Sequence, residues 1–149
     1  MAPSMKQPIT NLDSALWATQ GLLALTFFSA GAMKLVVSQE FLTTQGMAWA
    51  GRMPAELIPL IGTAEVLGAI GLLLPWYLHI APKLTPWAAL GLVTVMALGA
   101  TEHAMAGELL NIAPPLVLGG LAAFVAWGRL RTPSTHPTDL GIVRAGLTH

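Results

Sequence analysis

Four long apolar stretches separated by polar segments form the dominant pattern along the chain. They span residues 14–37, 55–77, 86–105 and 112–129, and charged residues are rare inside them. Each is close to the roughly 20 residues that an α-helix needs to cross the hydrocarbon core of a bilayer. The pattern therefore predicts an all-α protein, a four-helix transmembrane bundle whose membrane domain covers residues 14–131.

The segments outside these stretches are shorter and more polar. Residues 1–13 form a polar start, and residues 132–149 form a tail rich in Pro, Thr, Ser and His that we expect to be flexible. The longest internal connection runs over residues 38–55. Its part from Phe41 to Trp49 fits either a short helix, lying at the membrane interface or capping the bundle, or a plain loop.

Composition supports a membrane protein and removes several kinds of chemistry. Of the 149 residues, 54% are hydrophobic and 9% are charged, whereas soluble domains carry about 25% charged residues. The formal net charge is zero, so we expect no nucleic-acid partner. The chain has no cysteine, which excludes disulfides, thiolate nucleophiles and cysteine-ligated metals.

The charges of the loops predict the orientation in the membrane. Four crossings place both termini on one side, whose basic residues are Lys6, Lys83, Arg129, Arg131 and Arg144, against Lys34 and Arg52 on the other. The positive-inside rule makes the first side, and hence both termini, cytoplasmic. An aromatic belt is expected at the same interface, from Trp17, Trp76, Trp87 and Trp127. We therefore expect an integral membrane protein of a bacterial inner (plasma) membrane.

Glu65 is a single charge well inside the stretch 55–77. It lies about nine residues in, roughly 13 Å from the extracytoplasmic end at 1.5 Å per residue, where a charge costs roughly 2.5–3.5 kcal/mol on insertion scales. Lys34, Glu102 and His103 enter the same half from other helices. Intramembrane ionisable groups usually pair inside the bundle, so we expect a shared pocket open to the extracytoplasmic side. Glu102 and His103 differ by about 100° around their helix, which leaves open which of them faces it.

Acid–base catalysis is the chemistry that fits this set of residues best. Burial raises the pKa of a carboxyl group and a nearby lysine lowers it, so such a group can be poised to donate or accept a proton. A metal site of two carboxylates and one histidine offers few ligands. His79 and His103 lie at opposite faces, which excludes a haem held by both. We expect no metal, and the expected catalytic residues are Glu65, Lys34, His103 and Glu102.

Each of these expected catalytic residues also has a purely structural explanation. Lys34 lies near a helix end and can extend to the headgroups. Lys34 and Glu65 can form an ion pair that holds two helices in register without any chemistry. Glu102 and His103 can be ordinary residues of the membrane interface. The residues alone leave these alternatives open.

Small residues near the charged positions are candidate substrate contacts. Two glycines flank Glu65, and another lies one turn before Glu102. Small side chains allow close contact between helices or leave room for a ligand. The expected substrate-binding residues are Gly62, Gly68, Gly99, Trp49 and Asn111.

Several motifs resemble the DoxX-like family of membrane proteins. They are Gly21-Leu22-Leu23 with Phe27-Phe28-Ser29-Ala30-Gly31-Ala32-Met33-Lys34-Leu35, then Ile61-Gly62-Thr63-Ala64-Glu65-Val66-Leu67-Gly68-Ala69-Ile70-Gly71-Leu72-Leu73-Leu74-Pro75, and Ala100-Thr101-Glu102-His103. The resemblance covers residues 15–130 approximately, and Lys34 and Glu65 match the recurring Lys and Glu of the family. It implies a four-helix membrane bundle. The namesake of the family is associated with thiosulfate:quinone oxidoreductase, and the resemblance implies a quinone or another lipophilic small molecule as ligand. No other cofactor is evident, and the lack of cysteine argues against sulfur redox chemistry here.

Two functional hypotheses follow. In the first, the protein holds a small lipophilic substrate in its polar pocket, and Glu65 transfers a proton during isomerisation, epoxide opening or quinone-linked redox chemistry. In the second, it is a non-catalytic membrane subunit or scaffold of a redox or transport complex, with Lys34–Glu65 as a structural ion pair. The lipid bilayer is the expected partner in both, with a homo-oligomer or a membrane redox partner as further options. A proton-coupled carrier fits less well, because four crossings are few and no inverted repeat is present.

Overall fold

Helices make up nearly all of the part of the chain that the structure describes. The computed structural model describes residues 11–78 and 83–131. Its long helices are α1 (Asn11–Val36), α4 (Leu57–Tyr77), α5 (Leu84–Met105) and α6 (Ala113–Arg131), and its short ones are α2 (Gln39–Thr44), α3 (Ala48–Arg52) and the 3-10 helix η1 (Leu109–Ile112). The ends of the long helices differ from the ranges expected from the sequence by at most three residues. The expected flexible tail 132–149 and residues 1–10 of the polar start lie outside the described residues.

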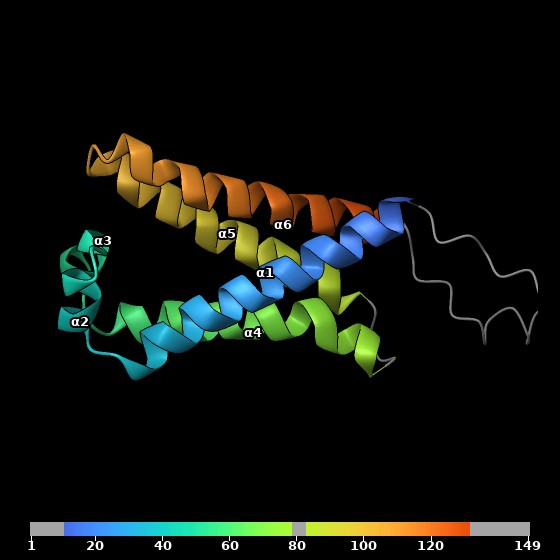
Figure 1. Ribbon diagram of the computed structural model, residues 1–149, viewed down its shortest axis with the longest axis horizontal. Helices are drawn as coiled ribbons and strands as arrows, with labels where there is room; N and C mark the ends of the chain where they lie inside the picture. Colours follow the sequence, from blue (N-terminus) through green and yellow to red (C-terminus); the bar gives the residue numbers. More distant parts are fainter. Residues whose placement is uncertain (1–10, 79–82, 132–149) are drawn as a thin grey trace, which may run out of the picture.

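The four long helices form two packed pairs. α1 packs along α4 and α5 along α6, while α4 also contacts α5 and α1 contacts α6 less extensively. The two pairs diverge towards α2 and α3 (Figure 1). We call this the cap end, and we call the opposite end, where α1 begins and α6 finishes, the terminal end. α4 begins and α5 finishes at the cap end, so the charged residues near those helix termini share one end of the bundle.

A single apolar core joins the four long helices. Its largest fully buried members include Leu23 and Phe27 of α1, Leu72 of α4, Leu92 of α5 and Val125 of α6. Alanines fill the spaces between these side chains, which lets the helices approach closely. This core occupies the region where the pairs converge, whereas the cap end has a smaller apolar cluster beside its polar side chains.

Two glycines set the closest approach between α1 and α4. A Cβ atom added to Gly31 would lie 2.6 Å from the carbonyl oxygen of Gly62, and one added to Gly62 would lie 2.8 Å from the carbonyl oxygen of Gly31. Only glycine fits both positions, because any side chain would collide with backbone. Lys34 and Glu65 follow these glycines by three residues each, so the crossing brings the two charged residues together.

The connection 38–55 forms a small helical cap. Ser38 accepts a hydrogen bond from the Phe41 N–H at 3.2 Å and so starts α2. Gly46 provides the turn to α3 with a φ of 85°, a conformation that favours glycine. The Gln39 side-chain amide donates to the carbonyl oxygens of Ala50 and Met53 at 2.7 and 2.9 Å, which ties α3 back to α2. Of the two alternatives left open by the sequence, the structure has the short helices.

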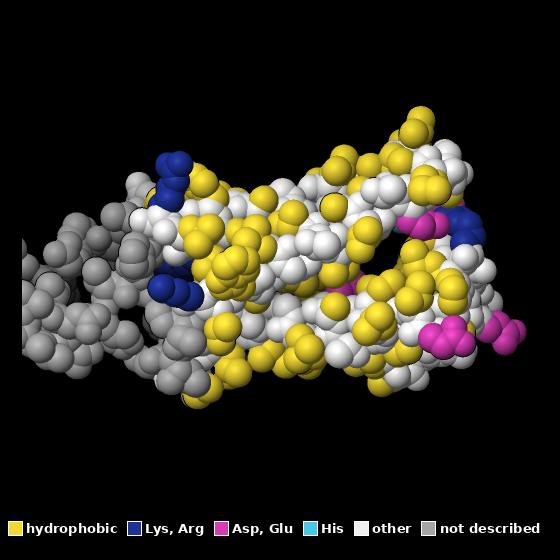
Figure 2. All heavy atoms as spheres, turned by 180° about the vertical axis from the view of Figure 1, so that it is seen from behind, with side chains coloured by type: hydrophobic (Ala, Val, Ile, Leu, Met, Phe, Trp, Pro, Cys, Tyr) yellow, Lys and Arg dark blue, Asp and Glu magenta, His cyan; other side chains and the backbone are white. Residues whose placement is uncertain are grey.

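The surface of the long helices is apolar. All four candidate spans are long and hydrophobic enough to cross a membrane: Asn11–Val36, Leu57–Pro75, Leu84–Met105 and Leu109–Arg131. Figure 2 shows apolar side chains over the length of the bundle, basic side chains near the terminal end and acidic ones at the cap end. Exposed leucines would be unfavourable in water but are well placed in lipid. The chain is therefore an integral membrane protein with an all-helical bundle.

Candidate functional site

A buried ion pair lies where α1 crosses α4. Lys34 Nζ is 2.6 Å from Glu65 Oε2, and the two side chains are 10% and 4% exposed. The Gly31–Gly62 contact brings the helices close enough for a direct bond of this length. A buried charge is costly unless it is paired, and here each side chain has the other as its partner.

The cap contributes an aromatic side chain to this pair. The Trp49 ring of α3 lies 5.6 Å from Lys34 Nζ, within the range of a cation–π contact. Trp49 packs against the small apolar cluster of Leu42, Ala50 and Ile58, which anchors α2 and α3 on the cap end of α1 and α4. The cap thus covers the lysine from the side facing away from the core.

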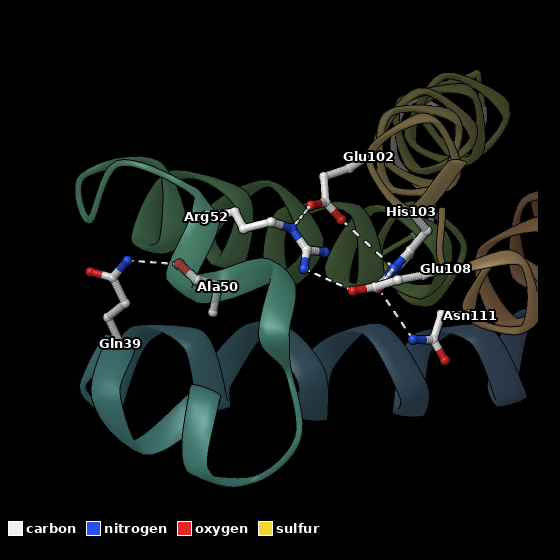
Figure 3. A network of polar contacts seen from close by, with 7 residues as sticks. All are labelled: Gln39, Ala50, Arg52, Glu102, His103, Glu108 and Asn111. Atoms are coloured by element: carbon white, nitrogen blue, oxygen red, sulfur yellow. Dashed lines mark hydrogen bonds and ion pairs between the residues drawn. The ribbon is translucent and has the colours of Figure 1, made fainter. Parts of the chain in front are cut away.

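A second polar group, the Arg52 network, joins the cap to the other helix pair. It consists of Arg52 from α3, Glu102 and His103 from α5, Glu108 from the turn that follows, and Asn111 from η1 (Figure 3). Arg52 Nε donates to Glu102 Oε1 at 2.7 Å and Arg52 Nη1 to Glu108 Oε1 at 2.8 Å. One arginine therefore bridges two carboxylates across the gap between the diverging pairs. Glu102 Oε2 is buried and has no hydrogen-bond partner among the described residues.

Glu108 is the centre of the Arg52 network. Its Oε2 lies 2.7 Å from His103 Nδ1 and accepts from Asn111 Nδ2 at 3.2 Å. Hydrogen bonds from Arg52, His103 and Asn111, in that order of importance, lower the pKa of Glu108 from 4.5 to about 2. Glu108 is therefore an ionised carboxylate throughout the physiological pH range.

An opening lies between the two helix pairs near the cap end. Figure 2 shows it as a gap through the molecule, bordered by apolar side chains and by acidic ones. The pairs diverge here because the apolar core does not extend this far, and the cap bridges them through the ion pairs of Arg52 (Figure 1). An opening with apolar walls and a few ionisable groups suits a small lipophilic molecule that carries a polar group.

The structure divides the expected constellation into two groups. Lys34 and Glu65 meet directly, whereas Glu102 and His103 belong to the Arg52 network. Among the described residues no hydrogen bond or ion pair joins the two groups. The reason is the divergence of the helix pairs, which places α5 away from α1 and α4 at this end (Figure 1).

The expected substrate-binding residues have different surroundings. Trp49 and Asn111 contact the ion pair and the Arg52 network, respectively. Gly62 faces Gly31 at the helix crossing, and a Cβ on Gly68 would lie 2.5 Å from Leu92, so both glycines allow close helix contact. A Cβ on Gly99 would meet only Pro115, at 3.8 Å, an ordinary contact.

Arg52 and Glu108 are site residues that the sequence interpretation did not select. Arg52 is separated from its partners by 50 and 56 positions, so no local spacing points to the pairing. Glu108 had a weak signal, since it follows Glu102 and His103 around the tight turn at Gly107. A turn that reverses the chain brings such neighbours together.

A polar cluster at the terminal end was also missed. Gln20 is 1% exposed, donates to the Leu72 carbonyl at 2.7 Å and accepts from Arg129 Nε at 2.6 Å. Arg129 also pairs with Asp13 at 2.8 Å and stacks on Trp17 at 4.8 Å. The signal was present, because Gln20 is a polar residue in an apolar stretch, as Glu65 is. This cluster ties α1, α4 and α6 together, and its contacts across three helices indicate a structural role, although Arg129 Nη2 is buried without a hydrogen-bond partner among the described residues.

The cap end holds two sets of ionisable side chains. Glu65 lies beside Lys34 in the buried pair, and His103 lies beside the ionised Glu108 in the Arg52 network. Among the described residues, no cluster of three or more histidine, aspartate or glutamate side chains has the geometry to hold a metal ion.

Comparison with known proteins gives one match. Residues 18–125 match the family model described as the DoxX-like family. This range includes all four long helices in large part, together with both polar groups of the cap end. No curated protein and no solved structure matches the chain.

Proposed function

The chain belongs to the DoxX-like family of membrane proteins, and we propose that it binds a small lipophilic substrate in the opening at its cap end. Glu65 transfers a proton to or from this substrate, and Lys34 holds the charge that the transfer leaves behind. The observation that carries the proposal is the buried 2.6 Å Lys34–Glu65 pair at the crossing of α1 and α4. Buried, paired ionisable groups of this kind are typical of functional sites.

The chemistry of the pair limits the reaction class. A carboxyl group near an ammonium can protonate a carbonyl or epoxide oxygen, or remove a proton next to a carbonyl group. Isomerisation and epoxide opening need only such steps. A quinone-linked redox reaction also needs protons at the quinone oxygens, while the electrons come from another donor. In each case the substrate reaches the opening from the lipid, because the spans around it are apolar.

We place the opening on the extracytoplasmic side of a bacterial inner membrane. The last turn of α6 brings Arg129 and Arg131 to the terminal end, where Figure 2 shows basic side chains, and this supports the orientation; the cap end shows acidic side chains together with basic ones. By the positive-inside rule the basic end faces the cytoplasm. Both termini are then cytoplasmic, and the substrate is drawn from the outer leaflet.

Native mass spectrometry of the protein purified in mild detergent tests the proposal. We expect the wild type to carry a co-purifying lipophile and Glu65→Gln to have lost it. Glu56→Gln is a matched control, because Glu56 is exposed at the cap end and belongs to neither polar group. A wild-type protein without ligand, together with a Glu65→Gln variant whose only defect is lower thermal stability, would show that the pair is purely structural.

A second function is favoured by a groove on the side of the bundle. It has a volume of about 240 Å³ and lies between α4 and α5. Its lining includes the small residues Ala64, Gly68, Ala88 and Gly91. Small residues at membrane depth allow a transmembrane helix of another subunit to approach closely. The protein would then be a non-catalytic subunit or scaffold of a redox or transport complex. Cross-linking in membranes from residues of this groove, with no ligand detected at Glu65, would favour this function.

A further inference from the structure

The hydrogen bond between His103 and Glu108 fixes which histidine nitrogen can exchange a proton. An ionised carboxylate only accepts hydrogen bonds, so the 2.7 Å contact with Glu108 Oε2 requires a hydrogen on His103 Nδ1. The low pKa of Glu108, about 2, keeps the carboxylate ionised. Nδ1 therefore carries a hydrogen in both the neutral and the charged ring. The nitrogen that is left to exchange a proton is Nε2.

Three further contacts hold this arrangement in place. Arg52 Nη1 and Asn111 Nδ2 donate to the two oxygens of Glu108, so the carboxylate cannot rotate away from the ring. Glu102 Oε2 lies 3.7 Å from His103 Nδ1, which adds a second negative charge on the same side of the ring. Both carboxylates, of Glu102 and Glu108, thus lie near the Nδ1 atom of the His103 ring, and the Nε2 atom is directed away from them.

We propose that His103 is a second proton-exchanging residue of the cap end, acting through Nε2, and that Glu108 is its positioning residue. A histidine whose one nitrogen is fixed by a carboxylate is a common way to prepare the other nitrogen as a base. Arg52 and Asn111 act through Glu108 and not on a substrate. The side chain of His103 is 16% exposed, against 4% for Glu65, so it is the better connected of the two to water.

This division gives the two polar groups different tasks. The Lys34–Glu65 pair is sealed by the helix crossing and by Trp49, so a proton that it gives up must be replaced through the opening. His103 lies on the facing helix pair and can exchange protons between water and a molecule bound in the opening. The use of His103 in turnover rests on the proposed function, whereas the tautomer and the positioning by Glu108 do not.

The buried oxygen of Glu102 supports a ligand or water at this place. Glu102 Oε2 is an acceptor without a hydrogen-bond donor among the described residues, although Oε1 of the same carboxylate is bound by Arg52. Buried acceptors in proteins nearly always have a donor, so this oxygen indicates a water molecule or a substrate group beside the imidazole.

Nitrogen-15 NMR of histidine-labelled protein in lipid nanodiscs tests the tautomer. The His103 signals are assigned by their loss in His103→Gln. We expect neutral His103 to carry its hydrogen on Nδ1 in the wild type and in the control Glu56→Gln. In Glu108→Ala we expect a mixture of tautomers. A wild-type ring with its hydrogen on Nε2 would overturn the proposal.

Acylation by diethyl pyrocarbonate, followed by peptide mass mapping, measures how fast His103 Nε2 reacts as a nucleophile. We expect His103 to react at Nε2 in the wild type and several-fold more slowly in Glu108→Ala. If Glu108→Ala does not fold, Asn111→Ala provides a milder loosening of Glu108, with a smaller decrease in rate. An unreactive wild-type His103, or equal rates in the wild type and the folded variants, would contradict a prepared Nε2. These readouts need no substrate, so their failure is distinguishable from the loss of ligand in Glu65→Gln.

Discussion

Replacing Gly31 by alanine should disturb both the bundle and the ion pair. The new Cβ would lie 2.6 Å from the Gly62 carbonyl oxygen, 2.9 Å from a Val66 methyl group and 3.0 Å from Glu65 Cβ. The first contact is with backbone, so no change of rotamer relieves it. Overpacking of this kind costs about 1–3 kcal/mol, and α1 and α4 must separate by about 0.8 Å to restore an ordinary contact.

This separation is large compared with the hydrogen bond that depends on it. Lys34 and Glu65 each lie next to a glycine of the crossing, and their 2.6 Å contact requires the helices to stay close. We therefore expect the thermal unfolding midpoint of Gly31→Ala, followed by circular dichroism in detergent, to fall by roughly 2–12 °C. Any ligand held at the pair should be retained less well.

Gly21→Ala is the matched control in the same helix. A Cβ at Gly21 meets nothing within 4 Å, and alanine in a helix is favoured over glycine by about 0.5–1 kcal/mol. Its midpoint should therefore stay equal to or rise above that of the wild type. An unchanged midpoint in Gly31→Ala would refute the close crossing as the feature that positions the pair.

Three further predictions concern other contacts. Gln20→Leu leaves Arg129 without one of its acceptors in a buried site, so the free energy of unfolding should fall by about 1–3 kcal/mol in denaturant titrations. Trp49→Leu removes the aromatic face from Lys34 and should cost about 0.5–2 kcal/mol by the same method. The pKa of Glu108 is lowered from 4.5 to about 2, so its bonds stabilise the fold above pH 4.5 and are lost as the pH falls towards 2. The midpoint difference between wild type and Glu108→Gln should stay constant above pH 4.5 and shrink below it, and a constant difference down to pH 2 would contradict this.

The lengths of the four apolar stretches and the charge of Glu65 inside one of them were sufficient to predict the helical bundle and the buried ion pair. Four apolar stretches long enough to cross a bilayer have few alternatives to a helical bundle. Glu65 needed a partner at its depth, and Lys34 was the basic residue that the helix directions brought to the same level. Both inferences use rules that depend on the chain alone and not on the detailed angles between helices.

The division of the cap end into two polar groups depends on those angles. The sequence places Glu102, His103 and Glu65 in the same half of the bundle, but it does not specify that α5 diverges from α4 at this end. The pairing of Arg52 with Glu102 and Glu108 connects residues 50 and 56 positions apart through a cap whose helices are five and six residues long. Helices this short leave little periodic signal in a sequence.

The glycines show a second limit of the sequence. A glycine such as Gly62 can leave room for a ligand or allow close contact between helices. The position of Gly31 on the neighbouring helix shows that Gly62 allows close contact. Gln20 shows an inference that could have been made, because a buried polar side chain in an apolar helix requires a partner wherever it occurs.

One measurement tests the proposed role of the pair most directly. It is the amount of small molecule bound per protein molecule, compared between the wild type and the double variant Lys34→Met/Glu65→Leu. Replacing a buried ion pair by apolar residues of similar volume is often neutral or stabilising, so the double variant should remain folded. Native mass spectrometry should find a lipophile on the wild type and none on a double variant of equal thermal stability. Equal amounts of the same molecule on both proteins would contradict a functional Lys34–Glu65 pair.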